Sequence, residues 1–137
     1  MAKEKRFDRV FISFILTGKD LDPNEVSVSL GLHPYKSFKS GDMRTETERW
    51  KHGYWEICSA EDVDSPDLAI HLEWIVDQLT PINQALQKLL SAQNMKAEIS
   101  CFWILDSGQS VLTLSPLLIE RLSELGVVIE LDIYSDG

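Results

Sequence analysis

The sequence predicts an α+β domain with a largely antiparallel sheet of four to five strands and helices packed on one face. Three observations predict it. Short segments alternate apolar and polar residues with a period of two, which is typical of strands. Two helices begin with a capping residue followed by proline and end with glycine, and a longer segment between them carries apolar residues every three or four positions.

Composition favours one globular domain, residues 1–137, because 44% of the residues are hydrophobic and 26% are charged. The 13 Lys and Arg against 22 Asp and Glu give a net charge of -9. This charge disfavours nucleic acid and anionic membrane as partners. It is also uneven, since residues 1–53 hold 10 basic and 8 acidic residues while residues 54–137 hold 3 and 14.

The first strand is expected to begin at Val10, where apolar residues alternate as far as Leu16. Basic residues precede this run, as in a signal peptide, but Glu4 and Asp8 dilute them and no small-residue cleavage site follows. We therefore expect residues 1–8 to be a flexible N-terminus and the protein to be cytoplasmic. The two cysteines, Cys58 and Cys101, fit a reduced compartment, although a disulfide stays open if their strands are neighbours.

The first helix is predicted to follow Asp22 as N-cap and Pro23 as first helical residue, and to end at Gly31. Residues 33–53 show no sustained period and are predicted to form a long loop, of the kind that is often functional. Residues 54–59 are predicted to form a second strand.

The second helix is predicted to open with Ser65 as N-cap and Pro66 as its first residue. Its apolar stripe continues in phase past Pro81, which cannot donate a backbone hydrogen bond. Either the helix kinks there or Thr80 caps a new helix, and the unbroken stripe favours a kinked pair that faces one sheet.

The last third predicts a strand at residues 97–105, a turn at 106–109, a short extended piece at 111–114 and a helix from Ser115 to Gly126. In the final strand, Glu130, Asp132 and Tyr134 share one face. The chain then contains two strand-helix-strand units, which together predict a ferredoxin-like sandwich. Whether the units arose by duplication stays open, because such helix ends are generic.

Catalytic and metal-binding patterns are missing from the sequence. His33, His52 and His71 are isolated from one another, and neither cysteine has a histidine nearby. Glu130 and Asp132 could act as a carboxylate pair, but a solvated face explains them more simply. We therefore expect no enzyme activity, no metal and no cofactor.

Basic and aromatic residues concentrate between His33 and Trp55. Such residues can bind phosphates and stack on bases, although aromatic residues in a long loop more often anchor it to the body of the protein. Both interpretations are kept as alternatives.

The order of several short motifs resembles the bacterial family called domain of unknown function 4279. The motifs are residues 20–23, 30–34, 39–42, 54–55, 114–116 and 125–126. The resemblance covers roughly residues 10–134 and implies a compact α+β protein of the bacterial cytoplasm with no assigned activity. Gly41, Asp42 and Trp55 match recurring family positions, with a role in either folding or binding.

The leading functional hypothesis is a non-enzymatic interaction or regulatory module, for example of the immunity type, that binds a basic protein partner. The alternative is a small-molecule or nucleotide sensor with a pocket between the sheet and residues 33–55. A homodimer is a further possibility. The candidate binding residues are Lys39, Asp42, Arg44, Trp50, Trp55, Glu130, Asp132 and Tyr134.

Overall fold

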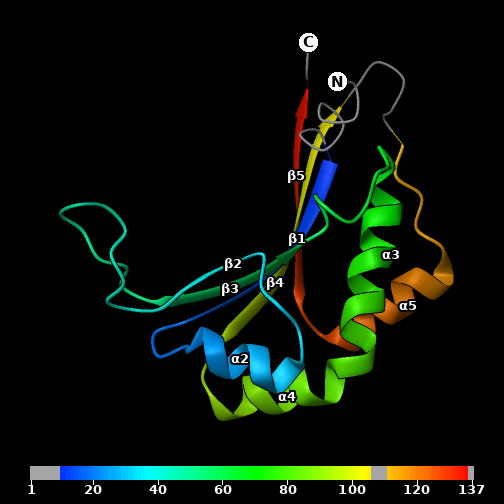
Figure 1. Ribbon diagram of the computed structural model, residues 1–137. Coiled ribbons are helices and arrows are strands. Elements are labelled where there is room, and N and C mark those ends of the chain that lie inside the picture. Colours follow the sequence, from blue (N-terminus) through cyan, green and yellow to red (C-terminus); the bar gives the residue numbers. More distant parts are fainter. Residues whose placement is uncertain (1–9, 106–110, 136–137) are drawn as a thin grey trace. The chain divides into compact units, whose positions relative to one another are not determined.

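The computed structural model describes residues 10–105 and 111–135 of the chain as a mixed α+β structure (Figure 1). The predicted flexible segment 1–8 and the predicted turn 106–109 lie outside these residues. The elements, in chain order, are β1 (Val10–Gly18), α2 (Pro23–Leu30), β2 (Lys36–Phe38), β3 (Gly53–Cys58), α3 (Leu68–Leu79), the 3₁₀ helix η1 (Thr80–Ile82), α4 (Asn83–Ala92), β4 (Lys96–Leu105), α5 (Pro116–Leu125) and β5 (Val128–Ser135).

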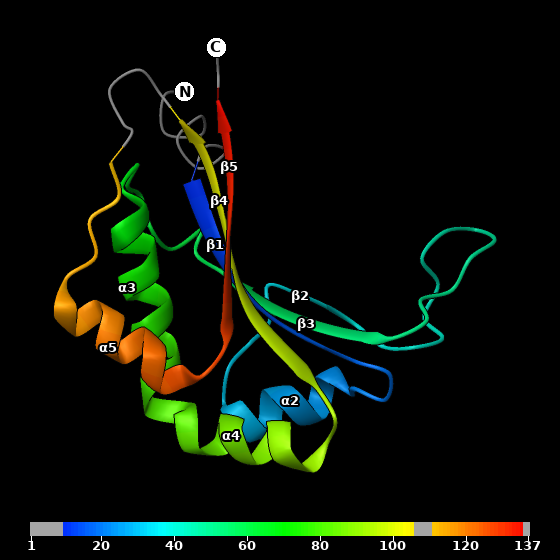
Figure 2. The same ribbon diagram turned by 180° about the vertical axis from the view of Figure 1, so that it is seen from behind.

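The sheet has five strands in the order β2-β3-β1-β4-β5 and is mostly antiparallel, as predicted. Strands β2 and β3 are antiparallel, with Lys36 opposite Glu56 and Phe38 opposite Tyr54. The arrowheads of β4 and β5 lie at the same end in both ribbon views, so α5 connects two parallel neighbours (Figures 1 and 2). The ferredoxin-like sandwich is not reproduced exactly, because β5 extends the sheet beyond β4. The two strand-helix-strand units also differ, because β3 lies between β1 and β2.

The chain forms two compact units, which are described separately. Unit 1 comprises residues 1–13, 58–81 and 99–137, and unit 2 comprises residues 14–57 and 82–98. The start of β1, α3, the end of β4, α5 and β5 belong to unit 1. The rest of β1, α2, β2, almost all of β3, α4 and the start of β4 belong to unit 2.

In unit 1, α3 and α5 lie on the same side of the strands and pack against each other (Figures 1 and 2). Arg121 of α5 donates to Asp77 of α3 at 2.8 Å. The core beneath these helices consists of residues with almost no exposed surface, among them Ile12, Leu68, Leu72, Ile75, Leu79, Ile99 and Leu125. Along β1 and β4, the buried core residues alternate with Phe11 and Phe102, whose stacked rings have centroids 4.9 Å apart. The period of two read from the sequence therefore separates two sheet faces.

In unit 2, α2 and α4 contact each other, and Trp55 of β3 is fully buried. The Trp55 indole N–H donates to the hydroxyl of Ser27 on α2 at 3.0 Å, which satisfies the one polar atom of the side chain. Helix α2 begins and ends as predicted. The carboxylate of Asp22 accepts the amide N–H of Asn24, and Gly31 adopts the left-handed conformation at φ 67°.

Two predicted helix boundaries were wrong. Helix α3 begins at Leu68 with Asp67 as its N-cap, whereas Ser65 accepts the amide N–H of Asp67 and forms the turn before it. At Pro81 the segment does not continue as a kinked helix, because η1 separates α3 from α4. Proline cannot donate the bond that a continuous helix needs, and the tighter 3₁₀ turn accommodates it. Residues 111–114, predicted as extended, are not part of a strand.

Cys58 and Cys101 are both buried, and neither forms a disulfide in the described structure. Strand β1 lies between β3, which carries Cys58, and β4, which carries Cys101, so their strands are not neighbours. Burial raises the pKa of the Cys101 thiol to about 12, so it is protonated at neutral pH. Among the described residues, none of the helices has both the length and the apolar character that crossing a membrane requires.

A buried chain of hydrogen bonds fixes the segment that follows β3. The hydroxyl oxygen of Ser59 accepts the Ile12 amide N–H at 2.9 Å and lies 2.6 Å from Nδ1 of His71. Nε2 of His71 lies 2.8 Å from the carbonyl oxygen of Ser65, which can only accept. His71 therefore donates from Nε2, and in the neutral imidazole Nδ1 accepts the hydroxyl proton of Ser59.

Acidification should destabilise the protein through His71. Burial lowers its pKa from 6.5, although the Ser65 carbonyl and Asp67 oppose the shift. The unfolded state then binds the proton more tightly than the folded state. The contribution of His71 to the free energy of unfolding is therefore constant well above pH 6.5, and it falls by up to about 1.4 kcal/mol per pH unit below pH 6.5. Urea unfolding between pH 7.5 and 5 should show this loss, and His71→Gln should reduce it. The exposed-site control His52→Gln should keep it. An NMR titration placing the pKa of His71 at or above 6.5 would contradict the prediction.

Gly53→Ala should destabilise unit 2 because the backbone of Leu21 approaches this glycine closely. An added Cβ would lie 2.8 Å from the Cβ of Leu21 and closer still to its carbonyl oxygen. Relief of such overlap typically costs about 1–3 kcal/mol. Gly18→Ala is the matched control, since its Cβ would meet nothing nearer than 3.5 Å. Equal urea midpoints for the two variants would show that the approach does not matter.

Candidate functional site

The candidate binding residues fall into two places in the structure. Lys39, Asp42, Arg44 and Trp50 lie in the segment between β2 and β3 in unit 2, whereas Glu130, Asp132 and Tyr134 lie on β5 in unit 1. Trp55 lies in the core of unit 2 with no exposed surface, so its visible contribution is to packing.

The segment between β2 and β3 is a hairpin rather than an irregular loop. Gly41 and Trp50 are joined by an amide-to-carbonyl bond, Trp50 donates back to Asp42, and Met43 forms a bridge with Arg49. The carboxylate of Asp42 accepts the Lys39 amide N–H at 2.9 Å. Gly41 has a φ of 94°, which side chains rarely permit. Gly41 and Asp42 therefore have a structural role in shaping the hairpin.

A row of stacked side chains, which we call the aromatic ladder, holds the hairpin. Phe38 of β2 stacks on Trp50 at 3.8 Å and on Tyr54 of β3 at 5.0 Å between ring centroids. Arg44 lies over the ring of Trp50 at 5.1 Å, and Lys36 lies over Tyr54 at 5.9 Å. The ladder is thus closed by a cation at each end.

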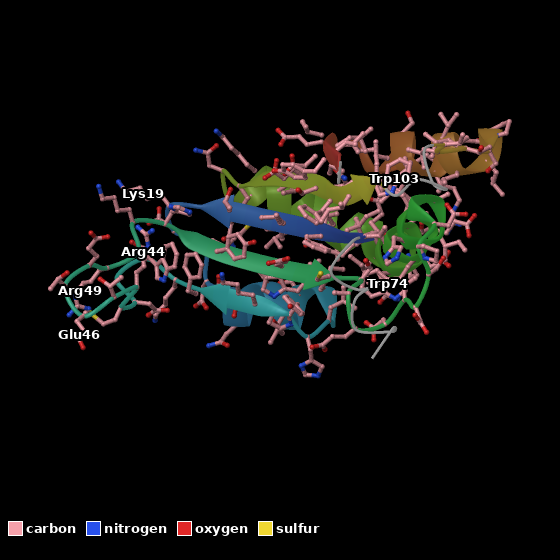
Figure 3. The ribbon with its side chains drawn as sticks, turned by 90° about the horizontal axis from the view of Figure 1, so that it is seen from above. Lys19, Arg44, Glu46, Arg49, Trp74 and Trp103 are labelled. Atoms are coloured by element: carbon pink, nitrogen blue, oxygen red, sulfur yellow. The ribbon has the colours of Figure 1, made fainter. Side chains whose placement is uncertain are left out.

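Both arginines of the hairpin make contacts within it. Figure 3 shows Arg44, Glu46 and Arg49 on the hairpin. Arg44 pairs with Glu48 at 3.3 Å, and Arg49 donates to the carbonyl oxygen of Gly41 at 2.7 Å. Of the two interpretations of this basic, aromatic segment, the geometry favours anchoring over nucleotide binding.

Grooves in unit 2 lie away from the hairpin. The most enclosed of them has a volume of about 460 Å³ and is lined by residues 18–21 and 92–95. Two more open grooves are lined by residues of α2 with Gln93 and by residues of α4. None of these three includes a residue of the segment 33–55, where the sensor hypothesis expects its pocket.

Strand β5 is exposed on both of its faces. It is the last strand in the sheet order, so no described strand pairs with its outer edge. Its apolar side chains stay open to solvent, with 39% exposure at Ile129, 50% at Leu131 and 46% at Ile133. Helix α5, which precedes it, uses its buried stripe against α3 instead. An eight-residue strand with a free edge and an uncovered apolar face is a template for another strand.

The other face of β5 is acidic and aromatic. Glu130, Asp132 and Tyr134 alternate with the apolar set, and the Tyr134 hydroxyl donates to Asp132 at 3.0 Å. That hydrogen bond and the charge of Asp132 raise the pKa of Tyr134. The ring of Tyr134 lies 5.4 Å from the ring of Phe102 between centroids, and Phe102 in turn stacks on Phe11. An aromatic row therefore crosses three adjacent strands beside the two carboxylates.

The sequence did not identify Ile129, Leu131 and Ile133 as site residues, because their alternation is typical of a strand face that a helix covers. The one available signal lies in α5. Its buried apolar stripe consists of Leu118, Leu122 and Leu125 alone and is narrow.

One serine–histidine pair could be mistaken for catalytic machinery. Ser59 and His71 are hydrogen-bonded, but both have no exposed surface, and the Ser59 hydroxyl is engaged by Ile12 and His71 together. A substrate cannot reach this hydroxyl without local unfolding. In the described part of the chain, side chains of His, Cys, Asp and Glu form no group of three that could hold a metal ion.

Comparison with known proteins gives one match. The model of the family described as Domain of unknown function (DUF4279) matches residues 8–136, nearly the whole chain. The chain shows no match among curated proteins or among solved structures.

Removing the centre of the aromatic ladder should release the hairpin. Phe38→Ala deletes the stacked contacts with Trp50 and Tyr54, each worth about 0.5–1.5 kcal/mol, and an edge contact with His52. Because cleavage follows the population of the open form, trypsin should cut at Arg44 and Arg49 about tenfold faster or more. Met43→Ala, at an exposed position of the same hairpin, is the control and should change the rate little. Equal rates for the wild type and Phe38→Ala would show that the ladder does not hold the hairpin.

Proposed function

The chain belongs to the family described as a domain of unknown function (DUF4279), and we propose that it acts as a non-enzymatic interaction module that binds a protein partner through strand β5. The observation that carries this proposal is the free outer edge of β5 together with its half-exposed apolar residues, Ile129, Leu131 and Ile133. A strand added to such an edge satisfies unpaired backbone groups and covers apolar side chains in one step.

The place of β5 in the chain supports the same proposal. Strands β1 to β4 have the sheet order β2-β3-β1-β4, which supports a ferredoxin-like unit. One helix, α2, connects β1 to β2, and α3, η1 and α4 together connect β3 to β4. We propose that β5 is an addition to such a unit, connected through α5. Its edge is then available for binding without disturbing the strands that form the core.

Charge indicates the kind of partner. Residues 54–137 hold 14 acidic and 3 basic residues, and Glu130 and Asp132 lie on β5 itself. Complementary charge raises association rates, so a basic partner would be captured fastest. An immunity-type protein of the bacterial cytoplasm that neutralises a basic enzyme, such as a nuclease, would have these properties.

A small-molecule sensor is the second candidate, favoured by the groove of about 460 Å³ at residues 18–21 and 92–95. A ligand that binds only the folded state raises the melting temperature. A thermal-shift screen of nucleotides and metabolites therefore distinguishes this function from the first.

Lysine substitutions on β5 should abolish partner capture. Leu131→Lys and Ile133→Lys place charges on the exposed apolar face, where a change costs the fold only about 0.5 kcal/mol. Affinity for a partner recovered from a lysate of the source organism should fall at least tenfold. The control is Val28→Lys on α2, an apolar residue that is 84% exposed. The proposal would be contradicted if the partner still binds Leu131→Lys and Ile133→Lys, or if Val28→Lys loses binding to the same extent. Unchanged circular dichroism would confirm that each variant is folded.

A further inference from the structure

We infer that the strand accepted by the β5 edge alternates basic and apolar residues. This inference deepens the proposed function and rests on it. It follows from the chemistry of the two faces of β5, one of which is apolar and the other acidic.

The geometry of strand pairing transfers the pattern of β5 to its partner. Side chains directly opposite each other on paired strands point to the same face, 4.5–5.5 Å apart between Cβ atoms. Residues paired beside Ile129, Leu131 and Ile133 would therefore meet exposed apolar surface. Residues on the other face would meet Glu130 and Asp132, so that face requires Lys or Arg.

The composition of β5 itself supports the requirement for basic residues. Strand β5 carries no Lys or Arg. On the acidic face, Tyr134 already donates to one oxygen of Asp132, whereas no hydrogen bond of the described residues involves the Glu130 carboxylate. The side chain of Tyr134 is 49% exposed and offers its ring to the stem or charge of an arriving Lys or Arg.

A second copy of the chain fits this edge poorly through its own β5. Consider two copies of β5 paired antiparallel and related by a two-fold axis. The two registers that align the most residues place the axis at Leu131 or at Asp132. The first places Glu130 opposite Asp132 of the other copy twice, and the second places Asp132 opposite itself. Like charges directly opposite each other destabilise a pair of strands. The strand that alternates basic and apolar residues therefore belongs to a different protein.

The test uses three labelled eight-residue peptides. One alternates Lys and Val, one alternates Glu and Val, and one has four Lys followed by four Val. Fluorescence anisotropy at low salt should show binding of the alternating Lys and Val peptide alone. Amide hydrogen exchange should show new protection in residues 128–134, which pairing produces and non-specific attraction does not.

Variants of equal charge change separate the β5 edge from general acidity. Glu130→Lys with Asp132→Lys should weaken binding of the alternating Lys and Val peptide roughly tenfold. The control pairs Glu73→Lys with Glu120→Lys, two exposed positions on α3 and α5, and should stay within about twofold. Equal loss in both double variants, or equal binding of the block peptide, would overturn the inference.

Failure of the inference can be told from failure of the proposed function. If Leu131→Lys abolishes partner capture but the Glu and Val peptide binds as well as the Lys and Val peptide, only the partner's chemistry is wrong. If Leu131→Lys changes neither peptide binding nor capture, β5 is not a binding edge. Sedimentation showing a dimer that Leu131→Lys dissolves would assign the edge to a second copy and overturn both.

Discussion

The central position of β1 is the constraint on which the rest of the structure depends. Ile12, Phe14 and Leu16 have no exposed surface, and β1 is flanked by β3 and β4. In the observed order, β3 and β4 flank β1, and β2 and β5 are the two edges of the sheet. These edges are handled differently. Strand β2 has three residues and carries Lys36, which are common protections of an edge, whereas β5 has eight residues and an uncovered apolar face.

Local signals in the sequence were sufficient to predict where helices α2 and α5 begin and end. The caps at Asp22 and Ser115 and the left-handed glycines Gly31 and Gly126 were predicted correctly, because a cap depends on residues within one turn of the helix. The start of α3 was missed because Ser65 and Asp67 can both accept an amide N–H, and only tertiary packing selects between them. Sheet order depends on contacts between distant residues, so the sequence predicted that strands exist but not that β5 is an edge.

The aromatic ladder explains why composition alone misjudges the hairpin. Lys36 and Arg44 beside aromatic rings are typical of a phosphate-binding surface, yet here both cations lie over rings of the same segment. A single sequence cannot distinguish a ring that stacks on a ligand from a ring that stacks on its neighbour. Only the distances between Phe38, Trp50 and Tyr54 make the distinction. In this segment, the basic and aromatic residues therefore hold the chain through contacts with one another.

The two carboxylates of β5 resolve a conflict that its apolar face creates. A long exposed edge with Ile129, Leu131 and Ile133 favours pairing with any available strand, including a second copy of itself. Glu130 and Asp132 penalise self-pairing in the registers that align the most residues, because acid then faces acid. The same charges lower the free energy of pairing with a basic strand. In the proposed function, the same two residues would therefore both disfavour self-association and select the partner.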